Sequence, residues 1–267
     1  MKRIILSITL LFTVFLVTVA QDSLAVSQPQ ALPAQSGSES AKTEYDEGAY
    51  PKAIELWEKE MNEQKALGRE SSDLYYNLGN AYFRLNNLAK SRLYYERALL
   101  LNPGDRDIRH NIDYLSTKIE DKILVADTFF LSIWFNAIQN IASSNGWATT
   151  AIISFLLLIA CLVIFFFTKM INIKKVAFYV GLVFVVIVIF ANIFAYRQKQ
   201  RVEVRDTAII MTGSASVVSS PDMNSKELFI LHAGTKVTIT KEDRSWLEIE
   251  IDNGSVGWIM REKIEII

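Results

Sequence analysis

The chain has 267 residues, a formal net charge of -1 and a mean hydropathy of +0.20. Its near-neutral charge leaves no broad electrostatic surface for nucleic acid, because that binding depends on many Lys and Arg contacts to phosphates. Its one cysteine, Cys161, excludes an internal disulfide framework and a cysteine-based metal site. A hydrophobic fraction of 51% is high for a soluble protein, so continuous apolar runs are expected.

The chain begins with the layout of a secretory signal peptide. Lys2 and Arg3 precede an apolar stretch over residues 4–19, and small residues lead up to a cut after Ala20. The alternative is an uncleaved signal anchor. In either case the segment that follows is exported. Residues 21–40 are rich in Ser, Gln, Ala and Pro and are predicted to form a disordered linker.

Residues 41–122 show helical spacing of apolar side chains, with a turn signal roughly every 15 positions. Within them, residues 73–103 resemble a tetratricopeptide repeat, a helix-turn-helix unit of about 34 residues. The matching positions are Tyr75, Leu78, Gly79, Tyr82, Tyr95, Ala98, Leu99 and Pro103. Gly79 allows the two helices to approach, Tyr82 and Tyr95 fill the space between them, and Pro103 stops the second helix.

Two departures from the repeat pattern are small: Ser91 replaces the usual Ala, and Asn86 stands where Gly often makes the turn. Residues 45–61 look like the latter part of a similar unit. Residues 105–122 are predicted to form a capping helix, because a repeat stack must close its last apolar face.

The repeat resemblance implies a concave groove lined by the first helix of each pair. The residues expected to face that groove and bind a partner are Tyr76, Asn77, Asn80, Phe83, Arg84, His110, Asn111 and Tyr114. Asn amides can bond the backbone of an extended peptide, and Arg84 can engage a carboxylate. The alternative is a solvated helix face with no ligand.

Residues 123–146 contain an apolar face with few charges and are predicted to form an interfacial amphipathic segment. Its apolar residues are Phe129, Phe130, Trp134, Phe135, Ile138 and Ile141. A continuation of the helical domain fits the same pattern.

Two uncharged runs, residues 147–167 and 176–196, each reach about 32 Å as a helix, which matches the hydrocarbon core of a bilayer. They are predicted to be transmembrane helices joined by a cytoplasmic loop over 168–175, which carries Lys169, Lys174 and Lys175. Basic residues from Arg197 to Arg205 favour the opposite orientation, but export of the first half decides against it. Both soluble domains are therefore expected in the periplasm.

From residue 202 the pattern changes to short alternating strands, expected at 208–210, 215–219, 236–240, 246–251 and 257–259. Turn signals lie at Ser220-Pro221, Ala233-Gly234 and Asn253-Gly254. Residues 202–267 resemble a bacterial SH3-like domain, a small all-β barrel, through residues 215–221, 231–239, 245–251 and 254–259. Trp246 and Trp258 are singled out as part of its surface or its core. The class binds cell-wall peptides or proteins.

The sequence offers no catalytic constellation, no metal site and no cofactor motif. His110 and His232 are the only histidines, and neither has a metal-spaced partner. No phosphate-binding Gly-rich loop occurs. The acidic cluster from Glu58 to Glu63 is interpreted as a solvated face. The chain is expected not to be an enzyme.

The expected fold is a multidomain membrane protein, with an all-α tetratricopeptide-repeat domain, a two-helix transmembrane hairpin and a small all-β SH3-like barrel. This order resembles the BatE-like family of the Bacteroides aerotolerance operon. The resemblance implies a place in the bacterial inner membrane beside von Willebrand-type proteins and a MoxR-type ATPase, with a role in oxygen tolerance. The expected function is a protein-protein interaction scaffold; the alternative is a peptidoglycan tether acting through the SH3-like domain.

Overall fold

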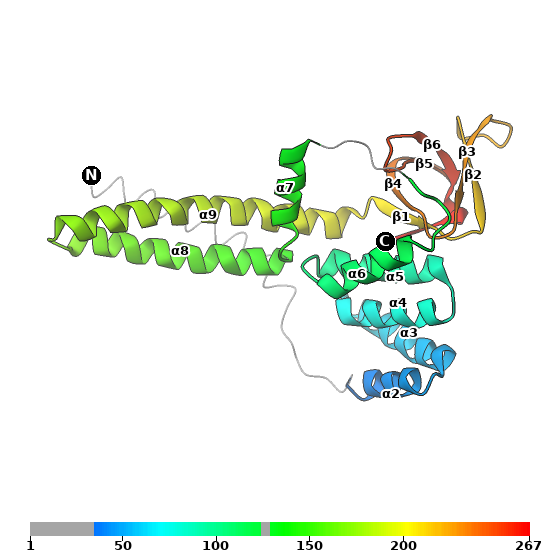
Figure 1. Ribbon diagram of the computed structural model, residues 1–267, viewed down its shortest axis with the longest axis horizontal. Helices are drawn as coiled ribbons and strands as arrows, with labels where there is room; N and C mark the ends of the chain where they lie inside the picture. Colours follow the sequence, from blue (N-terminus) through cyan, green and yellow to red (C-terminus); the bar gives the residue numbers. More distant parts are fainter. Residues whose placement is uncertain (1–34, 124–128) are drawn as a thin grey trace. The chain divides into compact units, whose positions relative to one another are not determined.

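A computed structural model describes residues 35–123 and 129–267 (Figure 1). The signal peptide expected over 1–20 and most of the linker expected over 21–40 lie outside the described residues. The chain divides into two compact units, and Ala142–Lys199 belong to the first. The second unit joins the described residues before Ala142 to Gln200–Ile267. The residues that precede Ala142 and those that follow Lys199 therefore form a single compact unit.

Five helices open the second unit: α2 (Gln35–Asp46), α3 (Tyr50–Ala66), α4 (Ser72–Arg84), α5 (Leu88–Leu101) and α6 (Arg106–Ser116). The helix α2 packs on α3 and α4 packs on α5, and α6 follows α5. This is the succession of helical hairpins and a final helix that the repeat pattern predicts. The helix α2 begins at Gln35, inside the segment expected to be a linker, and its Ala41, just after that segment, is fully buried in the repeat core.

The residues between and within the α4–α5 hairpin explain its geometry. The side chains of Ser71 and Asn87 cap α4 and α5 by accepting hydrogen bonds from backbone N–H groups. Asn86 takes the left-handed conformation of the turn, with φ 56°. A Cβ on Gly79 would lie 2.5 Å from the ring of Tyr95, so only glycine permits this helix approach. The predicted reason for Gly79 is confirmed.

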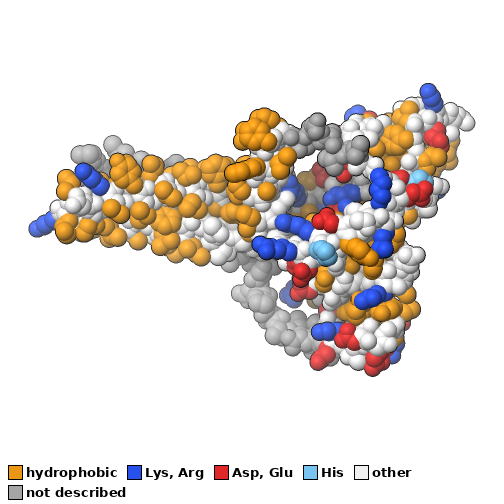
Figure 2. All heavy atoms as spheres, viewed as in Figure 1, with side chains coloured by type: hydrophobic (Ala, Val, Ile, Leu, Met, Phe, Trp, Pro, Cys, Tyr) orange, Lys and Arg blue, Asp and Glu red, His pale blue; other side chains and the backbone are white. Residues whose placement is uncertain are grey.

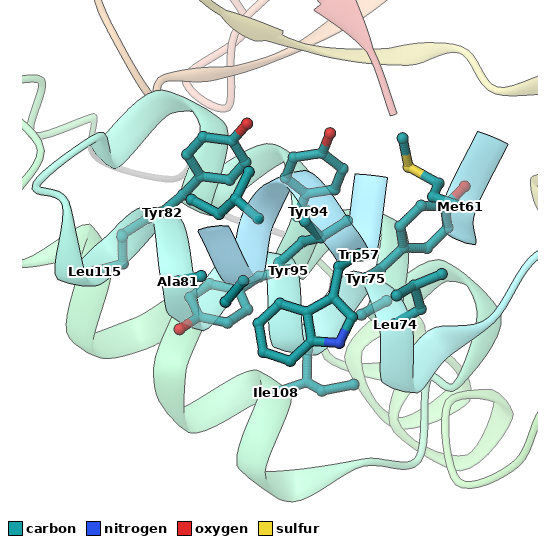
Figure 3. Close-up of a cluster of buried hydrophobic side chains, with 14 of the residues drawn as sticks. Trp57, Met61, Leu74, Tyr75, Ala81, Tyr82, Tyr94, Tyr95, Ile108 and Leu115 are labelled. Atoms are coloured by element: carbon teal, nitrogen blue, oxygen red, sulfur yellow. The ribbon is translucent and has the colours of Figure 1, made fainter. Parts of the chain in front are cut away.

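Large aromatic side chains fill the repeat core (Figure 3). Trp57 of α3 is almost fully buried, and Tyr82 of α4 stacks on Tyr94 of α5 with ring centroids 5.5 Å apart. Tyr82 and Tyr95 are 6% and 3% exposed, as expected of residues that fill the space between the paired helices. Burial of several such rings provides most of the apolar contact that holds the hairpins together.

The interpretation of the acidic cluster on α3 as a solvated face is wrong for Glu58. Its Oε1 accepts a hydrogen bond of 2.5 Å from the Tyr82 hydroxyl, and the Tyr94 hydroxyl lies 3.4 Å away. Burial and the bond to Glu58 raise the pKa of Tyr82. The hydroxyl groups of tyrosines in the core need a hydrogen-bond acceptor, and Glu58 of α3 supplies one.

Three further helices are α7 (Phe130–Gln139), α8 (Ser144–Phe167) and α9 (Ile171–Val204). Both α8 and α9 contain long apolar stretches, of whose residues only 11% and 22% are buried. The core helix of a soluble protein would be mostly buried, so these helices have the length and exposed apolar surface of membrane spans. The helix α9 starts at Ile171 and leaves only residues 168–170 between the two, fewer than the loop expected over 168–175.

The last part of the second unit is an antiparallel all-β domain, consistent with the SH3-like class. Its strands are β1 (Thr207–Ile210), β2 (Ser214–Val218), β3 (Glu227–His232), β4 (Lys236–Asp243), β5 (Trp246–Glu250), β6 (Val256–Met260) and β7 (Ile264–Ile266). They form one sheet in the order β3-β2-β6-β5-β4-β1-β7. Buried side chains from β1 to β6 meet in a single cluster, so the sheet curls around its own core.

Candidate partner-binding site

The side chains expected in the repeat groove come from α4 and α6, and the structure brings several of them together. Tyr95 donates from its hydroxyl to Asn80 Oδ1 at 2.6 Å. Asn111 of α6 donates from Nδ2 to the same oxygen and to the Tyr76 hydroxyl, both at 3.2 Å. We call Tyr76, Asn80, Tyr95 and Asn111 the polar seam. It links α4, α5 and α6, so these two Asn side chains already hold the helices to one another.

Beside the polar seam lies a more accessible group of predicted residues. Arg84, His110 and Tyr114 are exposed, and Phe83 is half-buried with its ring 5.8 Å from that of Tyr114. We call these four residues the groove strip. Arg84 Nε lies 3.4 Å from the Tyr45 hydroxyl of α2, which raises the pKa of Arg84, and the Lys118 ammonium lies 4.9 Å from the centre of the Tyr114 ring. The groove strip thus combines aromatic surface with cations, which suits a peptide bearing a carboxylate and an apolar side chain.

The eighth predicted groove residue, Asn77, is half-buried on α4. Asn77 follows Tyr76 directly, so its side chain points about 100° away from that of Tyr76 around the helix axis. Asn77 is therefore at the margin of the polar seam.

Trp246 and Trp258 lie on the face of the sheet that points away from the β-domain core. They alternate with the fully buried Leu247, Ile249 and Ile259 along β5 and β6, and both are half-buried. Cross-strand pairing sets Trp246 opposite Met260 and Trp258 opposite Glu248. Both tryptophans are therefore available at the surface.

Glu248, opposite Trp258, has its charge compensated. Lys241 Nζ lies 2.9 Å from its Oε2, and the Thr240 hydroxyl donates to the same oxygen at 2.8 Å. The hydrogen bond from Lys241 holds the pKa of Glu248 below its usual value. The surface around Trp258 is therefore aromatic and polar with little net charge.

Sequence reasoning missed a contact between the repeat helices and the β domain. Leu93 of α5 packs with Ile209 of β1 and with Ile267, and each of the three is at most 2% exposed. Arg97 of α5 donates to Glu265 Oε1 at 3.1 Å and to the Ile266 carbonyl at 2.6 Å. The partners are about 170 positions apart in sequence, so no local pattern could have paired them.

A carboxylate in this contact, that of Glu96, is almost fully buried. Glu96 of α5 accepts hydrogen bonds from Arg92 at 2.8 Å and from Lys236 of β4 at 2.7 Å. Burial by itself would raise the pKa of Glu96, but the two cations more than offset it and hold the pKa below its usual value. Glu96 therefore remains charged inside the contact and ties α5 to β4.

Asp121, which follows α6, forms hydrogen bonds with the turn between β3 and β4. Asp121 Oδ2 accepts from the His232 backbone N–H at 2.7 Å and from the Thr235 hydroxyl at 2.6 Å. Its Oδ1 lies 2.7 Å from His232 Nδ1, which raises the pKa of His232. A Cβ on Gly234 would lie 3.1 Å from Ile119, so this turn packs closely on the repeat part.

No group of three or more His, Cys, Asp or Glu side chains suited to a metal ion occurs in residues 35–123 or 129–267. Of the two histidines, His110 is exposed on α6 and His232 is bound to Asp121.

Stacked helical hairpins joined to a small β domain with two outward-facing tryptophans are typical of a protein built from interaction modules. The comparisons agree with this class. Residues 72–105 match the tetratricopeptide repeat family, and residues 213–263 match the bacterial SH3 domain family. Both are typically non-catalytic interaction domains. No curated protein matches the chain.

Proposed function

We propose that this protein is a non-enzymatic, membrane-anchored scaffold of the bacterial envelope, whose repeat groove binds a partner protein or peptide. The observation that carries the proposal is the groove strip. The rings of Phe83 and Tyr114 lie 5.8 Å apart, and Arg84 and His110 are exposed on the same two helices, at positions that the repeat resemblance assigns to partner contact. The polar seam beneath them fixes α4 against α6, so this surface is preorganised and costs little ordering on binding.

Membrane anchoring through α8 and α9 is the second part of the proposal. Figure 2 shows hydrophobic side chains covering the visible surface of these helices. Lys169, Lys174 and Lys175 at the connection favour the cytoplasmic side for that end. The soluble parts before and after the hairpin then lie outside the cytoplasm, on the periplasmic side of the inner membrane.

The contact between the repeat helices and the β domain supports this arrangement. Leu93 lies before the hairpin in sequence, whereas Ile209 and Ile267 follow it, and the three side chains are buried together. Residues packed in one core must share a compartment. An even number of spans between them satisfies that requirement, and two spans are what the chain offers.

The partners proposed for the groove are envelope proteins. The order of modules resembles the BatE-like family, and on that ground von Willebrand-type proteins of the same membrane are the first class to test. A role in aerotolerance or oxidative stress follows from that resemblance alone. The chemistry of the groove strip adds that the bound segment carries a carboxylate for Arg84 and an apolar side chain for Tyr114.

Site-specific photocrosslinking in intact cells tests the groove. A photoreactive side chain at Arg84, His110 or Tyr114 should give adducts with membrane proteins, and Arg84→Ala should weaken the adduct formed from Tyr114. The matched control is the same reagent at Lys59, an exposed residue of α3. No adduct from any groove position, or the same adducts from Lys59, would remove the groove as the binding site.

A second candidate function is a peptidoglycan tether acting through the β domain. It is favoured by the bacterial SH3 match and by the outward position of Trp246 and Trp258. The full chain in detergent should co-sediment with purified peptidoglycan, and Trp258→Ala should reduce the bound fraction while Tyr114→Ala should not. The full chain is needed because Ile209 and Ile267 of the β domain are buried against Leu93. Equal sedimentation of wild type and Trp258→Ala would exclude this surface.

A further inference from the structure

The helix α7 presents its apolar side outward. Large apolar residues are exposed along it, and Trp134 is 71% exposed. The exposed set is Phe129, Phe130, Leu131, Ile133, Trp134, Ile138 and Ile141. Among the helices of the second unit, this is the reverse of the arrangement in α4, whose apolar residues are the buried ones.

The polar residues of α7 are the ones that are covered. Gln139 is buried, and Asn136 and Asn140 are half-buried. The Asn140 carbonyl accepts from Arg109 of α6 at 2.7 Å, and its side-chain oxygen accepts from Arg201 at 2.9 Å. At 100° per residue, Ser132, Asn136, Gln139 and Asn140 share one side of the helix, and Phe130, Trp134 and Ile138 lie on the other. Protein therefore covers Asn136, Gln139 and Asn140 on the polar side in part or in full, whereas Ser132 on that side is exposed, and the apolar side has no cover within the described chain.

The sequence around α7 indicates what covers that side. Residues 129–167 include no Asp, Glu, Lys, Arg or His, so the absence of charge runs without a break from α7 into α8. Only residues 140–143 separate the end of α7 from the start of α8. A segment tied so closely to the start of a membrane span lies at the height of the membrane surface, where Trp and Phe side chains are favoured.

We propose that α7 lies in the headgroup boundary of the outer leaflet, with Phe130, Trp134 and Ile138 in the acyl region and the side of Asn136 toward the protein. The proposal rests on the membrane anchoring proposed above. The partner is the lipid bilayer itself. A helix that lies in the membrane surface is immersed to a depth of roughly 5–10 Å, which accommodates one helix face. The Arg109 and Arg201 contacts to Asn140 tie the end of α7 to the rest of its own unit.

Spin-label accessibility tests this in the full chain, placed in nanodiscs of phosphatidylethanolamine and phosphatidylglycerol. Cys161 is replaced by Ala, and single cysteines are introduced by Phe130→Cys, Trp134→Cys or Ser132→Cys. Labels at 130 and 134 should relax strongly with oxygen, which partitions into lipid, and weakly with a water-soluble nickel chelate. The label at 132 should show the opposite preference, and the oxygen-to-nickel ratio should differ several-fold between 134 and 132.

A label introduced by Leu157→Cys in α8, exposed in the middle of that helix, separates the two proposals. If 157 is accessible to oxygen alone while 134 meets the nickel chelate as readily as 132, the α7 inference is overturned and the anchoring stands. If the label at 157 is also accessible to the nickel chelate, both the membrane anchoring and the inference about α7 are contradicted. A label at 134 shielded from both reagents would mean that protein covers α7, which also overturns the inference.

A charge on the apolar side gives an independent check. Trp134→Glu should raise the nickel accessibility of a label at 130, because a carboxylate is costly to place in the acyl region. Asn136→Glu, on the side that the structure covers with protein, should leave that label unchanged. Equal effects of the two substitutions would contradict the proposed orientation of α7.

Discussion

Replacing Lys236 by Met should loosen the contact between the repeat helices and the β domain. The substitution keeps an apolar stem of similar length but removes one of the two cations bound to Glu96, which is almost fully buried. Arg92 stays, so the carboxylate keeps part of its compensation. The variant then loses one charged hydrogen bond between a buried carboxylate and a partly exposed ammonium group. This loss lowers the unfolding free energy by roughly 1–3 kcal/mol.

Thermal unfolding of the full chain in detergent provides the measurement. For a unit of this size, each kcal/mol lowers Tm by about 2–4 °C. Hydrogen exchange at β1 and α5 should rise in the same variant, because those elements meet at Leu93 and Ile209. Lys241→Met is the matched control: Lys241 is 67% exposed and pairs with Glu248 outside this contact, so the expected change in Tm is small.

A double-mutant cycle decides whether Glu96 is the reason for the loss. Glu96→Gln removes the charge, so adding Lys236→Met to it should cost clearly less than Lys236→Met alone, with a coupling of about 0.5–3 kcal/mol. Additive effects, or a Lys236→Met variant no less stable than Lys241→Met, would show that this ion pair does not hold the two parts together.

The remaining predictions concern the repeat, the turn and the topology. Gly79→Ala should destabilise the chain by about 1–3 kcal/mol, because its Cβ would lie 2.5 Å from Tyr95; Gly213→Ala, with open space around it, should change Tm little. The raised pKa of His232 means that its contact with Asp121 stabilises fully below pH of about 6.5 and is lost as the pH rises through the folded value. Tm should fall over that interval in wild type and not in His232→Gln; identical profiles would contradict this. Protease added to spheroplasts should cut both soluble parts, and protection of either one would refute the proposed topology.

The sequence predicted much of the fold, since local patterns determine it. Repeat spacing located α4, α5 and the turn at Asn86, and uncharged length located α8 and α9. The strand β3 was missed because Leu228 and Ile230 are exposed apolar residues, which turns the expected alternation into a continuous apolar run. The short strand β7 is defined by its pairing with β1, at the far edge of the sheet order, and three residues carry no periodic signal.

The candidate site divides along the same line. The repeat resemblance assigns residues of α4 and α6 to a groove, which stays a prediction. The polar seam could not be predicted, because it depends on distances among three helices. Asn80 and Asn111 were expected to bind a ligand backbone, whereas each has a hydrogen-bond partner within the protein. Whether they also contact a ligand stays a prediction. Arg84 and Tyr114 are the exposed members and carry the testable part.

One signal of the contact between the two soluble parts was present in α5. Leu93, Tyr94, Tyr95 and Glu96 are consecutive and all buried, and four successive residues cover a full helical turn. A helix packed only against its repeat neighbours would leave one side in water, so burial all round requires a second cover. Because the β domain supplies that cover at Leu93 and Glu96, this side of α5 is closed to partners.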